Sequence, residues 1–275
     1  MQKEIDKMNK RIGFIGSGNM AKAMIGGIVK SGLVNSENII SSDLNENTLK
    51  SIKREFNINT TTKSDEVVKN SDIVIVAVKP NIYDMVLESV KDFIDSDKII
   101  VTIAAGKNIS SIENIIGEDK KIIRTMPNTP ALVNEGMSAI CPNKNILNRE
   151  LEMVKSIFSS FGKAEVVNEY LIDSVIGVSG SSPAYVFMFI EAMADAAVLN
   201  GMPRNQAYKF AAQAVMGSAK MVLETGMHPG ELKDMVCSPG GTTIEAVKTL
   251  ENKGFRSCVI DAMTDCIEKS KEMSK

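Results

Sequence analysis

A glycine-rich segment near the amino end is the first part of the sequence whose residue types and spacing could do chemistry. Residues 16–21 read GSGNMA, a GxGxxA pattern that follows an apolar run and opens a helix-like stretch. In such a loop the first glycine makes a tight turn, the second lets the backbone approach a pyrophosphate, and the small last residue lets helix pack on strand. The amino end of the helix then faces the phosphates. We therefore predict a dinucleotide-binding loop. A nucleoside triphosphatase is disfavoured, because no GK[ST] follows the glycines.

The end of the second apolar run bears on which dinucleotide would bind. Residues 41–45 read SSDLN. An acid there, Asp43, is typical of NAD sites because it binds the ribose 2′-hydroxyl and repels a 2′-phosphate. The hydroxyls of Ser41 and Ser42 permit a phosphate, and no arginine is adjacent. These residues leave NAD and NADP both open.

Short apolar runs alternate with amphipathic stretches through the first half of the chain. The runs 11–15, 39–41, 73–78, 99–103 and 122–125 predict buried strands, and helices are expected at 19–31, 46–56, 64–69, 83–93 and 110–116. This alternation favours a parallel sheet covered on both faces. Residues 138–141 and 164–167 are expected to add strands around a helix at 149–161, in an order that the sequence does not reveal.

After residue 168 the pattern becomes helical, with stretches at 183–200, 204–225, 229–236, 242–252 and 257–272. The first two are apolar almost all round, and helices without a polar face are buried. We expect a two-fold helical dimer, the alternative being one self-contained bundle. The expected organisation is an extension at 1–10, an α/β dinucleotide-binding domain at 11–167 and an all-α domain at 168–275.

Composition excludes several classes of protein. The 275 residues carry 32 basic and 34 acidic side chains, so no basic footprint for nucleic acid is present. The start lacks the layout of a secretory signal, and the longest apolar run, Ala184–Ile190, is far shorter than the roughly 20 residues of a membrane span, so we expect a cytoplasmic protein. Four cysteines without a CxxC pair and one histidine, His228, argue against a metal site or a histidine-based hydrolase.

Five segments together resemble the pyrroline-5-carboxylate reductase family. They are GFIGSGNMA at 13–21, AVKP at 77–80, RTMPNTP at 124–130, GSSPAY at 180–185 and SPGGTT at 238–243. The resemblance spans nearly the whole chain from residue 11, with the motifs in the family's order. It implies a Rossmann domain followed by a helical domain that interleaves with a partner, in dimers that often assemble further into a decamer.

The resemblance also implies the reaction and its cofactor. The reaction is hydride transfer to 1-pyrroline-5-carboxylate, giving L-proline as the last step of proline synthesis. The hydride donor is expected to be NADPH, with NADH as the alternative. The cofactor is expected to contact Gly16, Ser17, Gly18, Asn19, Met20, Ser42, Asp43, Ser64, Ala77, Val78, Lys79, Pro80, Ile103, Ala104 and Ala105.

The substrate is expected to lie against Ser238, Gly240, Gly241, Thr242 and Thr243, with Glu169 as a secondary contact. This segment precedes a helix and offers backbone N–H donors for the substrate carboxylate. A protonated cyclic imine is already an electrophile, so catalysis can be largely positional. Thr243 is the expected partner of the ring nitrogen; from sequence alone, a helix N-cap is the more favoured role for it.

Other residues have plainer interpretations. Lys79 is expected to lie in a strand-end turn rather than to act as a catalytic amine. Arg124, in the RTMPNTP motif, is explained equally well by an ion pair with a core carboxylate. His228 is expected to be structural, at the start of a helix. A rival β-hydroxyacid dehydrogenase would need a catalytic lysine where Val186 stands. A non-catalytic NAD(P)-binding protein is the second alternative, but it would not need to keep the SPGGTT and GSSPAY segments.

Overall fold

The computed structural model describes residues 8–273, which form two compact units. One unit contains the chain up to Gly180 and the part from Cys266 onward, and the other is Ser181–Asp265. Residues 168–180, which the sequence assigned to the helical domain, therefore group with the sheet. Within the expected extension, residues 1–7 lie outside the described part, and the Met8 N–H donates to the Leu33 carbonyl at 2.8 Å.

The first unit is built on an eight-stranded sheet in the order β3-β2-β1-β4-β5-β6-β7-β8. Strands β1 to β6 run parallel, β7 is antiparallel to β6, and β8 is parallel to β7. The mainly parallel Rossmann-like sheet is thus confirmed, and the two late strands close it at one edge. The strands are β1 (Ile12–Ile15), β2 (Ile39–Ser42), β3 (Asn59–Thr61), β4 (Ile73–Val76), β5 (Ile99–Thr102), β6 (Lys121–Met126), β7 (Gly136–Pro142) and β8 (Gly162–Val166).

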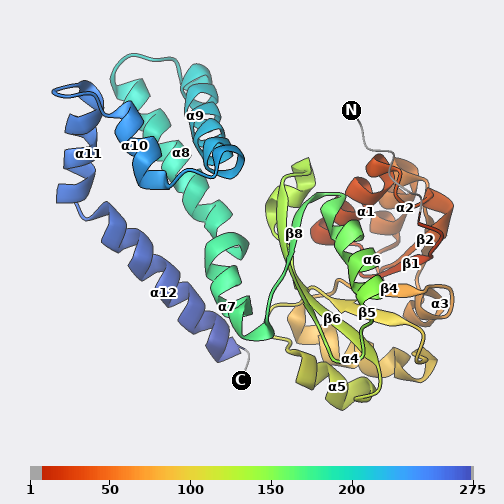
Figure 1. Cartoon of the computed structure of the whole chain (residues 1–275). Helices are drawn as coiled ribbons and strands as arrows, with labels where there is room; N and C mark the ends of the chain where they lie inside the picture. Colours follow the sequence, from red (N-terminus) through yellow and green to blue (C-terminus); the bar gives the residue numbers. More distant parts are fainter. Residues whose placement is uncertain (1–7, 274–275) are drawn as a thin grey trace. The chain divides into compact units, whose positions relative to one another are not determined.

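Helices cover both faces of this sheet (Figure 1). Because successive strand residues point to opposite faces, Ile73 and Ile75 join one buried cluster and Val74 and Val76 join the other. The helices are α1 (Asn19–Ser31), α2 (Glu46–Phe56), α3 (Ser64–Lys69), α4 (Pro80–Val90), α5 (Ile109–Ile116), α6 (Asn148–Ser159) and α7 (Ile172–Val175), with a π-helical turn at Ile176–Gly180.

The parallel order brings the ends of β1, β2, β4 and β5 to one edge of the sheet. Ile15 pairs with Ser42 on one side and with Val76 on the other, and Val76 pairs with Thr102. The loops that leave these four strands therefore start side by side, which is where open α/β sheets bind ligands.

The second unit is helical and exposes many large apolar side chains. Its helices are α8 (Ser182–Leu199), α9 (Arg204–Thr225), α10 (Pro229–Val236), α11 (Thr242–Asn252) and the first part of α12 (Phe255–Met273). Phe187, Phe210 and Leu223 are 63%, 67% and 80% exposed in the single chain. By length and composition alone, the described segment Glu169–Leu199 could cross a membrane, but a single such segment is weak evidence because the core helix of a soluble protein passes the same test.

Close packing of α1 against the turn before β8 generates a stability prediction. A Cβ at Gly27 would lie 2.4 Å from the Phe161 Cβ, whereas a Cβ at the neighbouring Gly26 would meet only the edge of the Phe56 ring, at 3.1 Å. Overpacking a core costs about 1–3 kcal/mol. We expect Gly27→Ala to lower Tm by several degrees and Gly26→Ala to change it less, measured by thermal unfolding of the purified protein. Equal effects of the two variants would contradict this packing.

Candidate active site

The turn after β1 is shaped so that only glycine fits at its first position. Gly16 has φ of +99°, and its N–H donates to the Ser42 carbonyl at 2.8 Å. A Cβ at Gly16 would lie 2.7 Å from the Ala77 carbonyl oxygen, at the end of β4. The loop therefore passes between the ends of the two strands that flank β1, as the glycine pattern predicted.

The next residue ties the loop to the end of β2. The Ser17 N–H donates to Asp43 Oδ2 at 2.9 Å, and the Ser17 and Ser41 hydroxyl oxygens are 2.7 Å apart. Ser41 is fully buried. From the sequence, the Ser41 hydroxyl was compatible with binding a phosphate. In the structure it instead hydrogen-bonds the Ser17 hydroxyl.

The amino end of α1 is open to a ligand. Its N-cap, Gly18, is exposed and provides no capping side chain, and the first turn carries no acidic residue. The first N–H groups of a helix lack intrahelical acceptors, and the helix dipole favours an anion near them. This helix end is suited to the pyrophosphate of a dinucleotide.

A cavity of about 400 Å³ adjoins the loop at the ends of β1 and β2. Side chains of α4 form one wall, and the β2 end and the start of α3 supply polar groups. This mixture of apolar and hydroxyl-bearing surface suits an adenosine. The lining residues are Ile15, Gly16, Ser42, Asp43, Leu44, Thr62, Ser64, Val78, Ile82, Met85, Val86 and Ser89.

The other residues expected at the cofactor follow β4 and β5 on the same edge. Ala77, Lys79 and Pro80 lie in the turn into α4, where Lys79 is the exposed N-cap residue. Ile103, Ala104 and Ala105 follow Thr102, whose Oγ1 accepts the Ala104 N–H at 3.2 Å. All these predicted positions lie beside the four strand ends described above.

Two buried polar residues that shape this edge, Thr125 and Asn128, were not predicted. The Thr125 hydroxyl donates to the Thr102 carbonyl at 2.8 Å. Asn128 accepts the Met137 N–H and donates to the Ser179 carbonyl, at 2.8 and 2.9 Å. The signal in the sequence was a hydroxyl or amide at the end of each apolar run, where such side chains organise loops.

Glu169 is engaged within the first unit. Its Oε1 accepts the Arg124 guanidinium N–H at 2.9 Å and the Ile109 N–H at 2.8 Å, at the first residue of α5. Arg124 is buried and pairs with this half-buried carboxylate, in agreement with the ion-pair interpretation of Arg124. These contacts favour a role for Glu169 in positioning α5 over direct contact with a substrate.

Burial determines the chemistry of the neighbouring thiol. Burial, helped by the negative charge of Glu169 and opposed by the positive charge of Arg124, raises the pKa of Cys141 to about 12. The thiol stays protonated near neutral pH and is therefore a poor nucleophile.

In the second unit, the segment expected to bind substrate forms a tight turn before α11. The Gly241 N–H donates to the Ser238 carbonyl at 3.0 Å, and Gly240, at φ of +68°, occupies the position of the turn that requires glycine. The N-cap of α11 is Gly241, without a capping side chain among the described residues. Thr243 lies two residues inside the helix, so the N-cap interpretation of this threonine is wrong.

His228 has the structural role that the sequence favoured. It is the N-cap of α10, and its Nδ1 accepts the Gly230 N–H at 3.0 Å.

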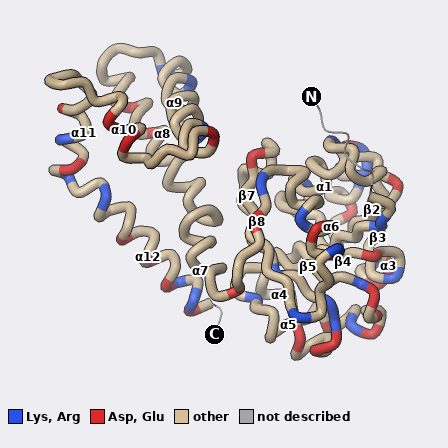
Figure 2. The backbone as a smooth tube through the Cα atoms, in the orientation of Figure 1, with Lys and Arg blue, Asp and Glu red and all other residues tan. Residues whose placement is uncertain are grey.

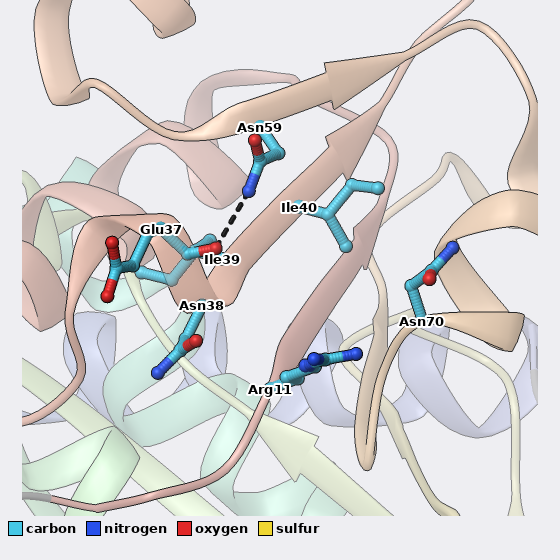
Figure 3. Close-up of a pocket in the computed structure, with 7 residues that line it drawn as sticks. All are labelled: Arg11, Glu37, Asn38, Ile39, Ile40, Asn59 and Asn70. Carbon is cyan, nitrogen blue, oxygen red and sulfur yellow. Dashed lines mark hydrogen bonds between the residues drawn. The ribbon is translucent and has the colours of Figure 1, made fainter.

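A second cavity, of about 380 Å³, lies at the opposite edge of the sheet (Figure 3). It is lined by residues at the starts of β1, β2 and β3, and Asn59 spans it by donating to the Glu37 carbonyl at 2.7 Å. Ligands of open α/β sheets bind at the carboxyl ends of strands, so the edge with the Gly16 turn is the one suited to a dinucleotide.

The Arg124–Glu169 pair generates a prediction that separates structure from substrate binding. Arg124 is buried and the Glu169 side chain is 34% exposed, so removing the carboxylate leaves a buried cation without this partner. We expect Glu169→Ala to lower the free energy of unfolding by about 2 kcal/mol. Glu165→Ala, at an exposed strand residue, is the matched control. Thermal unfolding and substrate KM are measured together: an unchanged Tm with a raised KM would instead identify Glu169 as a substrate ligand.

Comparison with models of known protein families gives two matches. Residues 169–273 match the family model described as pyrroline-5-carboxylate reductase dimerisation, and residues 11–106 match the model described as NADP oxidoreductase, coenzyme F420-dependent. The dimerisation match explains the apolar surface of α8 and α9 by pairing with a second copy of the chain.

Full-length relatives agree with these matches. The chain is 57% identical to the pyrroline-5-carboxylate reductase of Escherichia coli, over 98% of this chain and all of the relative. Two solved reductases, from Coxiella burnetii and, with NADP bound, from Plasmodium falciparum, are 33% and 34% identical, with TM-scores of 0.91 and 0.89. Each comparison covers 98% of this chain and all of the other. The Gly16 turn and the uncapped starts of α1 and α11 agree with this full-length similarity. The chain belongs to the pyrroline-5-carboxylate reductase family.

Proposed function

We propose that this chain carries out the reaction of its family, reduction of 1-pyrroline-5-carboxylate to L-proline, with the residues described above. In the reaction the imine carbon gains a hydride and the ring nitrogen keeps or gains a proton, so the C=N bond becomes a single bond. A bound nicotinamide dinucleotide supplies the hydride. The work of the protein is to hold and orient the two reactants and to exclude water.

The residues of the first unit fit a nicotinamide dinucleotide. The uncapped start of α1, from Gly18 to Met20, would hold the pyrophosphate, and the cavity containing Ser42, Asp43 and Ser64 would hold the adenosine. The turns at 77–80 and 103–105 would lie along the nicotinamide half, because they leave the neighbouring strands at the same edge.

The turn before α11 is the observation that carries the substrate assignment. Gly240 and Gly241 expose backbone there, and the first N–H groups of α11, beginning at Thr242, lie beside the Ser238 turn without a capping side chain. Such a helix start binds a carboxylate. The Thr243 hydroxyl, freed from capping, would hydrogen-bond the ring nitrogen.

The α8 sequence argues against the rival dehydrogenase. The catalytic lysine of such a dehydrogenase would stand at Val186, but the charged residues of the described helix α8 are both acidic (Figure 2). They are Glu191 and Asp195. Family membership and the intact substrate turn likewise favour a reductase over a protein that only binds the dinucleotide.

The apolar helices α8 and α9 belong to the dimerisation segment and bear on how the chain assembles. The dimerisation segment forms a homodimer, and we propose further assembly of dimers into a decamer in the cytoplasm. The apolar stretch Glu169–Leu199 lies entirely within the dimerisation match, so subunit contact accounts for its hydropathy.

Activity is tested by following NADH and NADPH at 340 nm with pyrroline-5-carboxylate. Thr243→Ala should lower kcat about ten- to hundredfold, the size expected for losing a hydrogen bond to a charged group, with the cofactor Kd unchanged. Thr249→Ala is the matched control, because that hydroxyl bonds only the Glu245 carbonyl within α11. Unaltered turnover in Thr243→Ala would remove Thr243 from the mechanism, and no oxidation of either cofactor by the wild type would refute the reductase.

A further inference from the structure

The Asp43 carboxylate is fixed in place at the adenosine cavity. Its Oδ2 accepts the Ser17 N–H and its Oδ1 accepts the Asn45 N–H, both at 2.9 Å. Two backbone donors on opposite oxygens leave the side chain little freedom to turn away from the cavity it lines. A negative charge is thus built into the end of β2, where the adenine ribose of a bound dinucleotide lies.

The cavity offers no cation to balance a phosphate. Among the described residues that line it, none is Lys or Arg. Two lysines adjoin lining residues in the sequence without lining the cavity themselves. Lys63 precedes Ser64, and its Nζ lies 3.3 Å from Glu66 Oε1; Lys79 follows Val78 and is the exposed N-cap residue of α4. The Ser41 hydroxyl, which could have bonded a phosphate, is buried against Ser17.

We propose that Asp43 makes this chain prefer NADH to NADPH. The preference rests on the cofactor site proposed above. A ribose 2′-hydroxyl can donate a hydrogen bond to the fixed carboxylate, whereas a 2′-phosphate would place two like charges together with no cation among the described residues that line the cavity. The reductase from Plasmodium falciparum was solved with NADP bound, so this preference is a property of the residues of this chain and not of the family.

Binding of two cofactor fragments tests the preference apart from turnover. We expect calorimetric titration of the wild type to give a Kd for ADP-ribose at least about tenfold lower than for its 2′-phosphate derivative. The ratio of kcat/KM for NADH to that for NADPH should exceed one in parallel. Asp43→Asn keeps an oxygen acceptor for the loop but removes the charge, and should bring the two Kd values at least about tenfold closer.

Two further variants serve as controls. Asp72→Asn makes the same change in charge at an aspartate that accepts the Arg11 N–H at 2.8 Å, at the opposite edge of the sheet, and should leave the ratio of Kd values unchanged. Lys63→Ala should also leave it unchanged, because its ammonium pairs with Glu66.

Each other outcome overturns the proposal in a distinguishable way. Equal binding of the two fragments, or tighter binding of the phosphorylated one, would refute the preference while leaving the cofactor site intact. A preference for ADP-ribose that survives Asp43→Asn would assign the selectivity to another residue. Failure of both fragments to bind the folded wild type would overturn the cofactor site and the preference together.

Discussion

The close approach of the Gly16 turn to the ends of β2 and β4 is the constraint on which the cofactor site depends. The Gly16 N–H is bonded to the β2 end, and the space toward the Ala77 carbonyl admits only hydrogen. This turn directs Ser17 at Asp43 and starts α1 with its N–H groups free. A side chain at position 16 would move the loop, the helix start and the carboxylate partner at once, because all three are joined through it.

The two units contribute different chemistry. The sheet unit provides an uncapped helix start, proposed for the pyrophosphate, and the cavity proposed for adenosine. The helical unit provides a second uncapped helix start, at α11, proposed for the substrate carboxylate. The first turn of α1 carries no acidic residue, whereas the first turn of α11 carries one, Glu245. In the proposed function both anionic ligands are bound largely by backbone groups, so a single histidine, used as a helix cap, is enough.

Local signals made much of this fold predictable. The bounds of three helices agree with the prediction: 19–31, 46–56 and 204–225. Each ends where a glycine or asparagine in the left-handed conformation follows it. The strand β3 was missed because three polar residues at a sheet edge carry no apolar pattern. Contacts between distant residues were beyond the sequence: the Ser41 hydroxyl and Glu169 are committed to partners 24 and 45 residues away, respectively. Thr243 was placed correctly in its motif, but only the structure shows that Gly241 is the cap.

The central claim is that the dinucleotide binds at the carboxyl edge of the parallel strands. Hydrogen–deuterium exchange of the protein with and without NADH tests it most directly. We expect NADH to slow exchange in segments 16–20, 42–45, 77–80 and 103–105, and to leave the amino-edge segments 37–40 and 59–61 unchanged. Protection confined to the amino-edge segments, with none at the Gly16 turn, would contradict the account.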